Sequence, residues 1–129
     1  MNHADELVRT LVTRPAVYVQ PDASLRSVAE TLAEESIGAV LVRGPHGAEG
    51  LVSERDIAMA LAEGANPDRT HAVDVMAEEL VSVTPTDTVR HAVHLMLECE
   101  IRHVPVVEDG VAFAMISARD ALKALATED

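Results

Sequence analysis

Two pairs of apolar runs stand out in the pattern of hydrophobic and polar positions. Residues 104–107 and 111–116 are almost continuously apolar and are separated by Glu108-Asp109-Gly110, which predicts a β-hairpin buried on both faces. Residues 38–43 and 48–53 predict a second hairpin with its turn at 44–47. The remaining pattern predicts short strands at 17–19 and 81–83, helices at 4–13, 25–35, 54–63, 88–99 and 118–126, and a polar linker at 66–70.

The chain contains an internal repeat with a spacing of 64 residues. Residues 17–62 align with residues 81–126 without a gap, and fifteen of these forty-six positions are identical. Such a repeat predicts one module of two similar halves. The fold class is therefore α/β, with two pseudo-two-fold-related β-α-β-β-α halves. We place the first repeat at about 12–64, the linker at 65–72 and the second repeat at about 73–127.

Composition narrows the classes of function. The formal net charge of −12 argues against a nucleic-acid partner or an anionic membrane surface, and the chain has no tryptophan and only one phenylalanine and one tyrosine. A single cysteine excludes an internal disulfide and suits a reducing compartment. We see neither a signal peptide nor an apolar run of transmembrane length, so we expect a soluble, cytoplasmic protein.

A Ser-x-x-Asp motif follows the second strand of each predicted hairpin, as Ser53–Asp56 and as Ser117–Asp120. This spacing fits a helix capping box, which needs no ligand. Both copies also carry an arginine, Arg55 or Arg119, and both follow a buried strand. A hydroxyl, free N–H groups and an arginine at a helix start can hold a phosphate, and the carboxylate can hold ribose hydroxyls. The repeated context favours nucleotide binding, and capping alone stays an alternative.

These motifs resemble the signature of a CBS (cystathionine beta-synthase) domain. The resemblance rests on Ile-Arg-His-Val-Pro-Val-Val-Glu-Asp-Gly followed by Met-Ile-Ser-x-x-Asp in the second half, and on Ile-Gly-Ala-Val-Leu-Val followed by Gly-Leu-Val-Ser-Glu-Arg-Asp in the first. It covers essentially the whole chain, which is similar to the stand-alone bacterial proteins built as a tandem CBS pair. It implies two pseudo-symmetric clefts that bind AMP, ADP, ATP or S-adenosyl compounds as regulatory ligands, with no cofactor.

The resemblance also implies which residues form each site. In the family, the serine of the motif contacts phosphate, the aspartate holds the ribose, and the segment entering the other half completes the cleft around the adenine. The stronger site then comprises Ser117, Arg119, Asp120, Arg102, His103, Thr13 and Ala16. The weaker site comprises Ser53, Arg55, Asp56, Ala77 and Leu80. The Asp56 site is the weaker one because it has Gly38-Ala39 at the positions where the Asp120 site has Arg102-His103.

Other residue groups predict no chemistry of their own. His91 and His94 lie three apart and near Cys99, but we interpret them as solvated histidines and a buried or half-buried structural cysteine, not as a metal or catalytic site. We interpret the methionines at 59, 76, 96 and 115 as core residues. We expect a non-enzymatic sensor that forms a homodimer and passes the bound state either to a protein partner or through its own dimer. The alternative is a scaffold of the same fold that binds no ligand.

Overall fold

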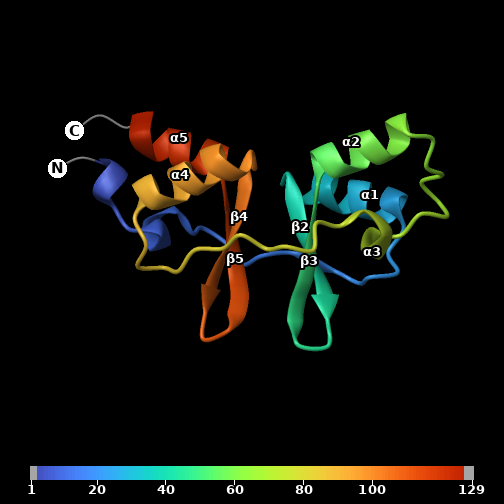
Figure 1. Ribbon diagram of the computed structural model, residues 1–129, viewed down its shortest axis with the longest axis horizontal. Helices are drawn as coiled ribbons and strands as arrows, with labels where there is room; N and C mark the ends of the chain where they lie inside the picture. Colours follow the sequence, from blue (N-terminus) through green and yellow to red (C-terminus); the bar gives the residue numbers. More distant parts are fainter. Residues whose placement is uncertain (1–2, 127–129) are drawn as a thin grey trace. The chain divides into compact units, whose positions relative to one another are not determined.

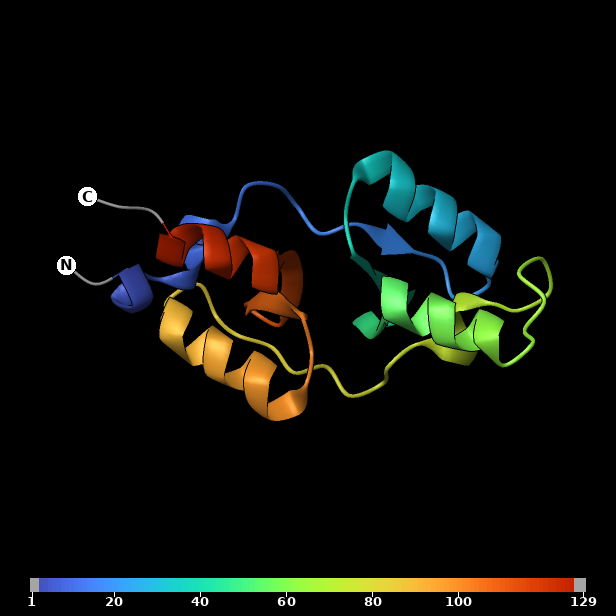
Figure 2. The same ribbon diagram turned by 90° about the horizontal axis from the view of Figure 1, so that it is seen from above.

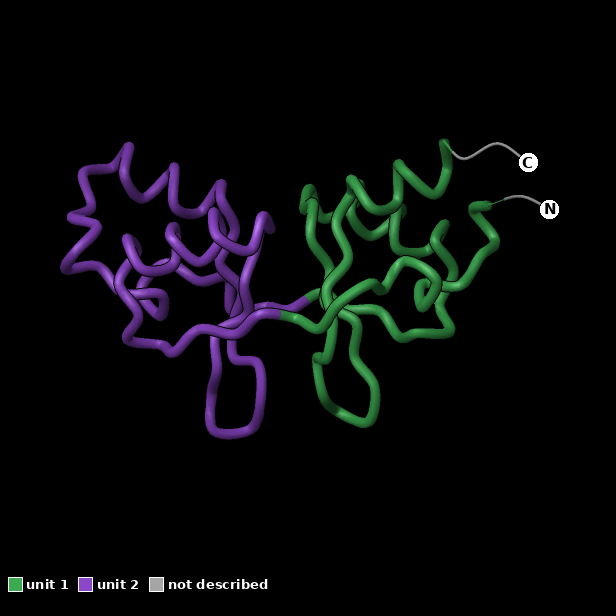
Figure 3. Tube along the Cα trace, turned by 180° about the vertical axis from the view of Figure 1, so that it is seen from behind, with its two compact units in different colours: residues 1–16, 81–129 green, residues 17–80 purple. Residues whose placement is uncertain are grey.

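The computed structural model describes residues 3–126, and the chain forms two compact units (Figure 3). Unit 2 is the continuous segment Val17–Leu80, whereas unit 1 combines Met1–Ala16 with Val81–Asp129. The units therefore divide the chain differently from the sequence repeats. Each unit is described by itself below.

Unit 2 contains the predicted β-α-β-β-α order (Figure 1). Strand β1 is parallel to β2, and β2 is antiparallel to β3 in a three-stranded sheet of order β1-β2-β3. Helices α1 and α2 lie side by side against this sheet (Figures 1 and 2). The elements are β1 (Tyr18–Val19), α1 (Leu25–Glu35), β2 (Ala39–Gly44), β3 (Gly47–Ser53), α2 (Glu54–Ala62) and the short α3 (Ala72–Val75).

Unit 1 repeats this plan with a two-stranded sheet. Its elements are the 3-10 helices η1 (His3–Asp5) and η2 (Val8–Leu11), then α4 (Val89–Cys99), β4 (His103–Glu108), β5 (Val111–Ser117) and α5 (Ala118–Ala126). Helices α4 and α5 pack side by side, as α1 and α2 do in unit 2 (Figure 2).

The strand predicted at 81–83 does not form. Only Val83 pairs with Val106, in an isolated parallel bridge. In unit 2 the Leu41 N–H donates to the Val17 carbonyl over 2.9 Å, and this bond helps to build β1. The position that corresponds to Leu41 is Pro105, which has no N–H to donate, so the ladder cannot extend there.

The single helix predicted at 4–13 is also wrong, because the structure has two 3-10 turns there. Leu7 separates them with an extended backbone (φ −82°, ψ 146°). It forms an antiparallel bridge with Thr88, so tertiary pairing interrupts the helix.

Each unit is completed by a segment that precedes the other repeat. We call residues 3–16 the first strap and residues 67–80 the second strap. The Val8 N–H donates to the Asp87 carbonyl over 2.7 Å, and the corresponding Ala72 N–H donates to Ala23 over 2.8 Å. The segment expected as a linker at 65–72 thus overlaps the second strap, which lies within unit 2.

The straps also contribute to the two apolar cores. Val8 is fully buried in the core of unit 1, and Ala72 is fully buried in that of unit 2. In unit 1 the larger Val8 of the strap shares a core with the smaller Ala92 of α4. In unit 2 the sizes are exchanged, with Ala72 in the strap and Val28 in α1. The exchange keeps the packed volume similar. The core clusters are Val8, Val83, Ala92, Met96, Val104, Val106, Ala114 and Ile116 in unit 1, and Val28, Leu32, Val40, Val42, Val52, Ile57 and Ala72 in unit 2.

The hairpins differ in part from the expectation of burial on both faces. In β4 the consecutive residues Val104, Pro105 and Val106 are all buried, as expected. In β5 burial alternates, with Ala114 and Ile116 buried but Met115 only half-buried. In each of the returning strands β3 and β5, one face is therefore more exposed to solvent than the other. Of the methionines predicted in the core, Met96 is buried, Met76 and Met115 are half-buried, and Met59 is 51% exposed.

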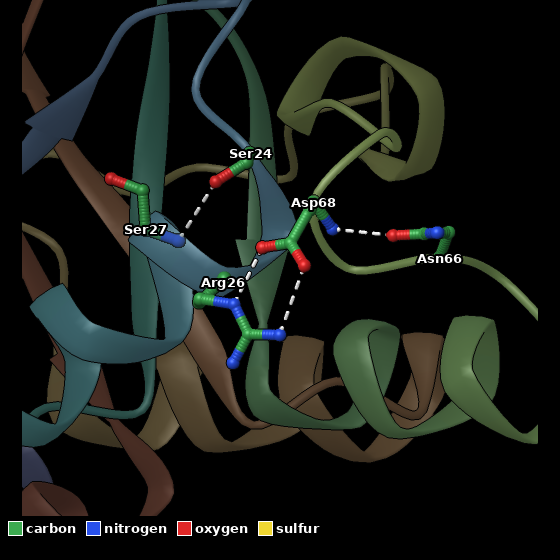
Figure 4. Close-up of polar contacts among 5 residues, drawn as sticks. All are labelled: Ser24, Arg26, Ser27, Asn66 and Asp68. Atoms are coloured by element: carbon green, nitrogen blue, oxygen red, sulfur yellow. Dashed lines mark hydrogen bonds and ion pairs between the residues drawn. The ribbon is translucent and has the colours of Figure 1, made fainter.

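An ion pair attaches the second strap to α1 (Figure 4). The Arg26 guanidinium donates from Nε and Nη2 to the two carboxylate oxygens of Asp68, over 2.5 and 3.1 Å. Ser24 caps the same helix by accepting from the Ser27 N–H over 3.1 Å. The corresponding arginine of unit 1, Arg90, contacts Asp5 of the first strap at 3.3 Å.

This pair gives a pH dependence with a definite sign. The hydrogen bond from Arg26 holds the pKa of the Asp68 carboxyl below its usual range. The stabilising contribution is therefore complete above the unfolded-state pKa and is lost as the pH falls through the lower folded-state pKa. We expect wild type to be slightly more stable than Arg26→Gln at neutral pH, with the gap closing in acid and in high salt. Urea unfolding across acid pH checks this, and a gap that widens in acid would contradict it.

Candidate functional site

The Ser117–Asp120 motif joins β5 to α5 and forms a reciprocal capping box. The Ser117 N–H donates to Asp120 Oδ2 over 2.8 Å, and the Asp120 N–H donates to Ser117 Oγ over 3.1 Å. Within residues 3–126, neither the Ser117 hydroxyl hydrogen nor Asp120 Oδ1 has a hydrogen-bond partner. Both residues are only half-buried, so these two groups can reach a ligand.

Basic residues of β4 lie beside this motif. His103 is the cross-strand partner of Ser117, and the Ala118 N–H donates to the Arg102 carbonyl over 2.8 Å. Arg119 follows in the first turn of α5. The Arg102 and Arg119 side chains are exposed, and neither forms an ion pair with another residue of the described chain. The fold thus gathers five of the seven residues predicted for the stronger site at one helix start.

The remaining two predicted residues belong to the first strap. The Ala16 N–H donates to the Phe113 carbonyl over 2.9 Å, which places Ala16 against β5, the strand that ends at Ser117. Thr13 is exposed, and no hydrogen bond links it to the motif. The structure therefore brings Ala16 to the strand of the site and leaves Thr13 unconnected to it.

The corresponding motif of unit 2 joins β3 to α2. The Ser53 N–H donates to Asp56 Oδ2 over 2.8 Å, and the Asp56 N–H donates to Ser53 Oγ over 3.2 Å. Here the Ser53 hydroxyl also donates to Asp56 Oδ2, over 2.9 Å. Ala39 is the cross-strand partner of Ser53, and the Glu54 N–H donates to the Gly38 carbonyl over 2.9 Å. Arg55 is exposed in the first turn of α2.

The second strap crosses β3 close to this motif. Ala77 and Leu51 exchange two backbone hydrogen bonds, of 3.1 and 2.9 Å. Gly50 makes this approach possible, since a Cβ there would lie 2.7 Å from Met76 Cγ and 3.0 Å from the Ala77 carbonyl oxygen. Leu80 is half-buried further along the strap, without a hydrogen bond to Ser53 or Asp56.

Sequence reasoning missed Glu54 and Gly50. The alignment of the repeats contained the signal, because it sets Glu54 against Ala118 and Gly50 against Ala114. Only the strap contact shows why the glycine matters.

The residues considered for a metal site are not arranged for one. Across residues 3–126, no group of three or more His, Cys, Asp or Glu side chains is placed to hold a metal ion. His91 and His94 are exposed, as interpreted from the sequence. Cys99 is exposed as well, so the expectation of a buried or half-buried cysteine is wrong; it is the last residue of α4, where the helix leaves the core.

The same part of the chain contains no helix that is both long and apolar enough to span a bilayer.

Comparison with known proteins accounts for the repeated hairpin-and-helix plan. The family model described as "CBS domain" matches residues 8–63 and again residues 72–127. The chain belongs to the CBS domain family. The two matches are offset by the same 64 residues as the internal repeat, and each begins at a core residue of a strap, Val8 or Ala72.

The chain is similar to other CBS domain-containing proteins. A mitochondrial CBS domain-containing protein of Arabidopsis thaliana is 30% identical over 118 residues, which is 87% of this chain but only 57% of that protein. Solved structures match over a greater share of their length. A CBS-domain protein from Agrobacterium tumefaciens is 32% identical, with a TM-score of 0.86 over 92% of this chain and 98% of that one.

Solved structures similar to this chain include complexes with adenosyl ligands. A CBS domain protein from Pyrobaculum aerophilum, in complex with AMP, is 31% identical, with a TM-score of 0.79 over 95% of this chain and 100% of that one. The relatives thus include plant, bacterial and archaeal proteins, so they are not confined to bacteria.

Proposed function

We propose that this protein is a regulatory module that binds an adenine nucleotide of the AMP, ADP or ATP type at the Ser117–Asp120 site. The observation that carries the proposal is the gathering of Arg102, His103 and Arg119 around a helix start that has an unpartnered serine hydroxyl. Membership of the CBS family and the AMP complex of the Pyrobaculum relative support the same ligand class.

Each group suits one part of a nucleotide. The Ser117 hydroxyl, the start of α5 and the two arginines suit phosphate oxygens, because all of them offer hydrogen-bond donors or positive charge. Asp120 keeps its cap through Oδ2, which leaves Oδ1 to accept from a ribose hydroxyl. We assign the base to the part of the first strap around Ala16, because Ala16 is hydrogen-bonded to β5, the strand that ends at Ser117.

The bound state would act by differential affinity for two conformations, since a ligand shifts an equilibrium only through such a difference. We propose no catalytic step for these residues. The expected homodimer and protein partner stay predictions; Leu97 of α4 and Leu122 of α5, which are 72% and 65% exposed, are apolar side chains that a second copy could cover.

Isothermal titration of the purified protein with AMP, ADP, ATP and GMP tests this proposal. We expect adenine nucleotides to bind and to add about 2.7 kcal/mol to the free energy of unfolding at a concentration of 100 times the Kd, which also raises the melting temperature. GMP is the control for base specificity. Absence of binding for all four at millimolar concentration would overturn the proposal and favour the scaffold alternative, in which both Ser-x-x-Asp motifs serve only as caps.

A further inference from the structure

The two straps are attached to their sheets in different ways. In unit 2 the second strap lies along the outer edge of β3, where Ala77 and Leu51 exchange backbone hydrogen bonds of 3.1 and 2.9 Å. The repeat places Thr13 and Met115 at the corresponding positions of unit 1. Within residues 3–126, no hydrogen bond joins these two residues. The first strap reaches β5 through a backbone bond at Ala16 instead.

The outer edge of β5 is consequently open at Met115. The cross-strand partner of Met115 is Pro105, which has no N–H, and the Pro105 carbonyl accepts from the Val83 N–H over 3.0 Å. The N–H and C=O of Met115 therefore point away from β4, and in the described part of the chain neither has a hydrogen-bond partner. An unpaired donor and acceptor at a strand edge can pair with another extended segment.

One methyl group accounts for this difference between the units. A Cβ at Gly50 would lie 2.7 Å from Met76 Cγ and 3.0 Å from the Ala77 carbonyl oxygen, so the second strap needs the glycine in order to lie against β3. The corresponding residue of unit 1 is Ala114, which is fully buried and carries that Cβ. In a close-packed interior the methyl group excludes a strap from the same position. Ala114 thus keeps the first strap off the outer edge of β5.

The position of the strap bears on the Ser-x-x-Asp motif. Leu51 and Met115 each lie two residues before the serine of their motif, about 7 Å along an extended strand. In unit 2, where the strap is seated, the Ser53 hydroxyl donates to Asp56 Oδ2 over 2.9 Å. In unit 1, where the edge is open, the Ser117 hydroxyl has no acceptor within residues 3–126. A strap seated on β5 would therefore lie beside a hydroxyl that a nucleotide needs.

We propose that the first strap is a gate over the unit 1 site and that Ala114 holds this gate open. The inference rests on the proposed function of that site. In the closed state Thr13 would exchange two backbone hydrogen bonds with Met115, as the second strap does with β3, and the strap would cover the Ser117 hydroxyl. A ligand at this hydroxyl binds only the open state, so it shifts the strap away from β5.

Ala114→Gly tests the gate, because it removes the methyl group that keeps the strap away from β5. The Met115 amide should exchange with solvent at least about tenfold more slowly in this variant than in wild type, as expected of a newly bonded N–H. If about nine molecules in ten are then closed, AMP should bind about tenfold more weakly, because the apparent Kd is the intrinsic Kd divided by the open fraction. Hydrogen exchange followed by NMR and isothermal titration measure the two effects on the full chain.

Ala112→Gly is the matched control. Ala112 is a second buried alanine of β5, so its replacement causes a similar loss of packing and strand stability. It lies two residues away from the position that corresponds to Gly50, where the straps cross. We expect the exchange rate of the Met115 amide and the affinity for AMP to stay close to those of wild type. Equal effects of the two substitutions would overturn the gate.

The outcomes also separate the gate from the proposed function. Unchanged exchange at Met115 in Ala114→Gly would overturn the gate. Slower exchange with unchanged or tighter AMP binding would overturn it too, because the seated strap would then not cover the site. In both cases the proposed function stands if wild type binds AMP. If wild type binds no nucleotide, the proposed function is wrong and the gate has no ligand to admit, so the inference is wrong as well.

Discussion

Replacing Asp120 with alanine is expected to weaken AMP binding by about 100-fold. A carboxylate oxygen such as Asp120 Oδ1 that accepts from a ribose hydroxyl makes a charge-assisted hydrogen bond worth up to about 3 kcal/mol, and the loss of about 3 kcal/mol corresponds to about 100-fold in Kd. The same substitution removes the Asp120 half of the α5 capping box, which should lower the free energy of unfolding by about 1 kcal/mol. Isothermal titration and urea unfolding measure the two effects separately.

Asp56→Ala is the matched control, since it removes the equivalent capping carboxylate from α2. We expect a similar loss of stability, of about 1 kcal/mol, and AMP affinity close to that of wild type. If both variants lose stability but neither loses affinity, the motifs are caps alone and the site lies elsewhere. If Asp56→Ala loses AMP affinity and Asp120→Ala does not, the assignment of the phosphate site to unit 1 is reversed.

Replacing Val8 with asparagine is expected to lower the free energy of unfolding by about 3–5 kcal/mol. Val8 is fully buried in the core of unit 1, although α4, the first long element of that unit, begins only at Val89. The substitution loses about 2 kcal/mol of apolar burial and leaves an amide without partners in the core. Chemical denaturation followed by circular dichroism measures the loss.

Arg9→Asn provides the control, because Arg9 occupies the same 3-10 turn but is exposed. Its effect should stay within about 0.5 kcal/mol. Similar effects of the two substitutions would contradict the packing of the first strap against unit 1. Hydrogen exchange adds a second readout: protection in Val8→Asn should fall first at amides of β4 and β5, and protection in β2 and β3 should fall less.

Local pattern was sufficient to predict the hairpins, the four long helices and the Ser-x-x-Asp caps. These elements depend on contacts between near neighbours in sequence: alternating or continuous apolar runs, a turn such as Asp109-Gly110, and a serine three residues before an aspartate. The repeat then identified Arg102 and His103 as the residues that distinguish the two sites, and the structure places both beside Ser117.

The errors lie where distant segments meet. The strand at 81–83 was predicted from its apolar residues, but the proline in the neighbouring strand cannot donate the bond that it needs. The helix at 4–13 was predicted from its apolar spacing, but Leu7 pairs with Thr88 instead. In both places a partner far away in the sequence overrides local propensity.

The sequence by itself therefore determined the family, through the resemblance of its motifs. It also determined the repeated fold and the chemical groups at each helix start, because local hydrogen bonding and periodicity set both. The resemblance already implies that the segment before each repeat completes the other one. Only the tertiary structure decided which bonds hold these straps, such as those from Val8 to Asp87 and between Ala77 and Leu51. It also decided that Gly50 admits the second strap, and that the Ser53 hydroxyl is bonded to its own aspartate while the Ser117 hydroxyl is not. The strap contacts depend on the close approach of segments that are far apart in the sequence. The difference between the two serine hydroxyls depends on side-chain geometry within each motif, which the motif's spacing does not fix.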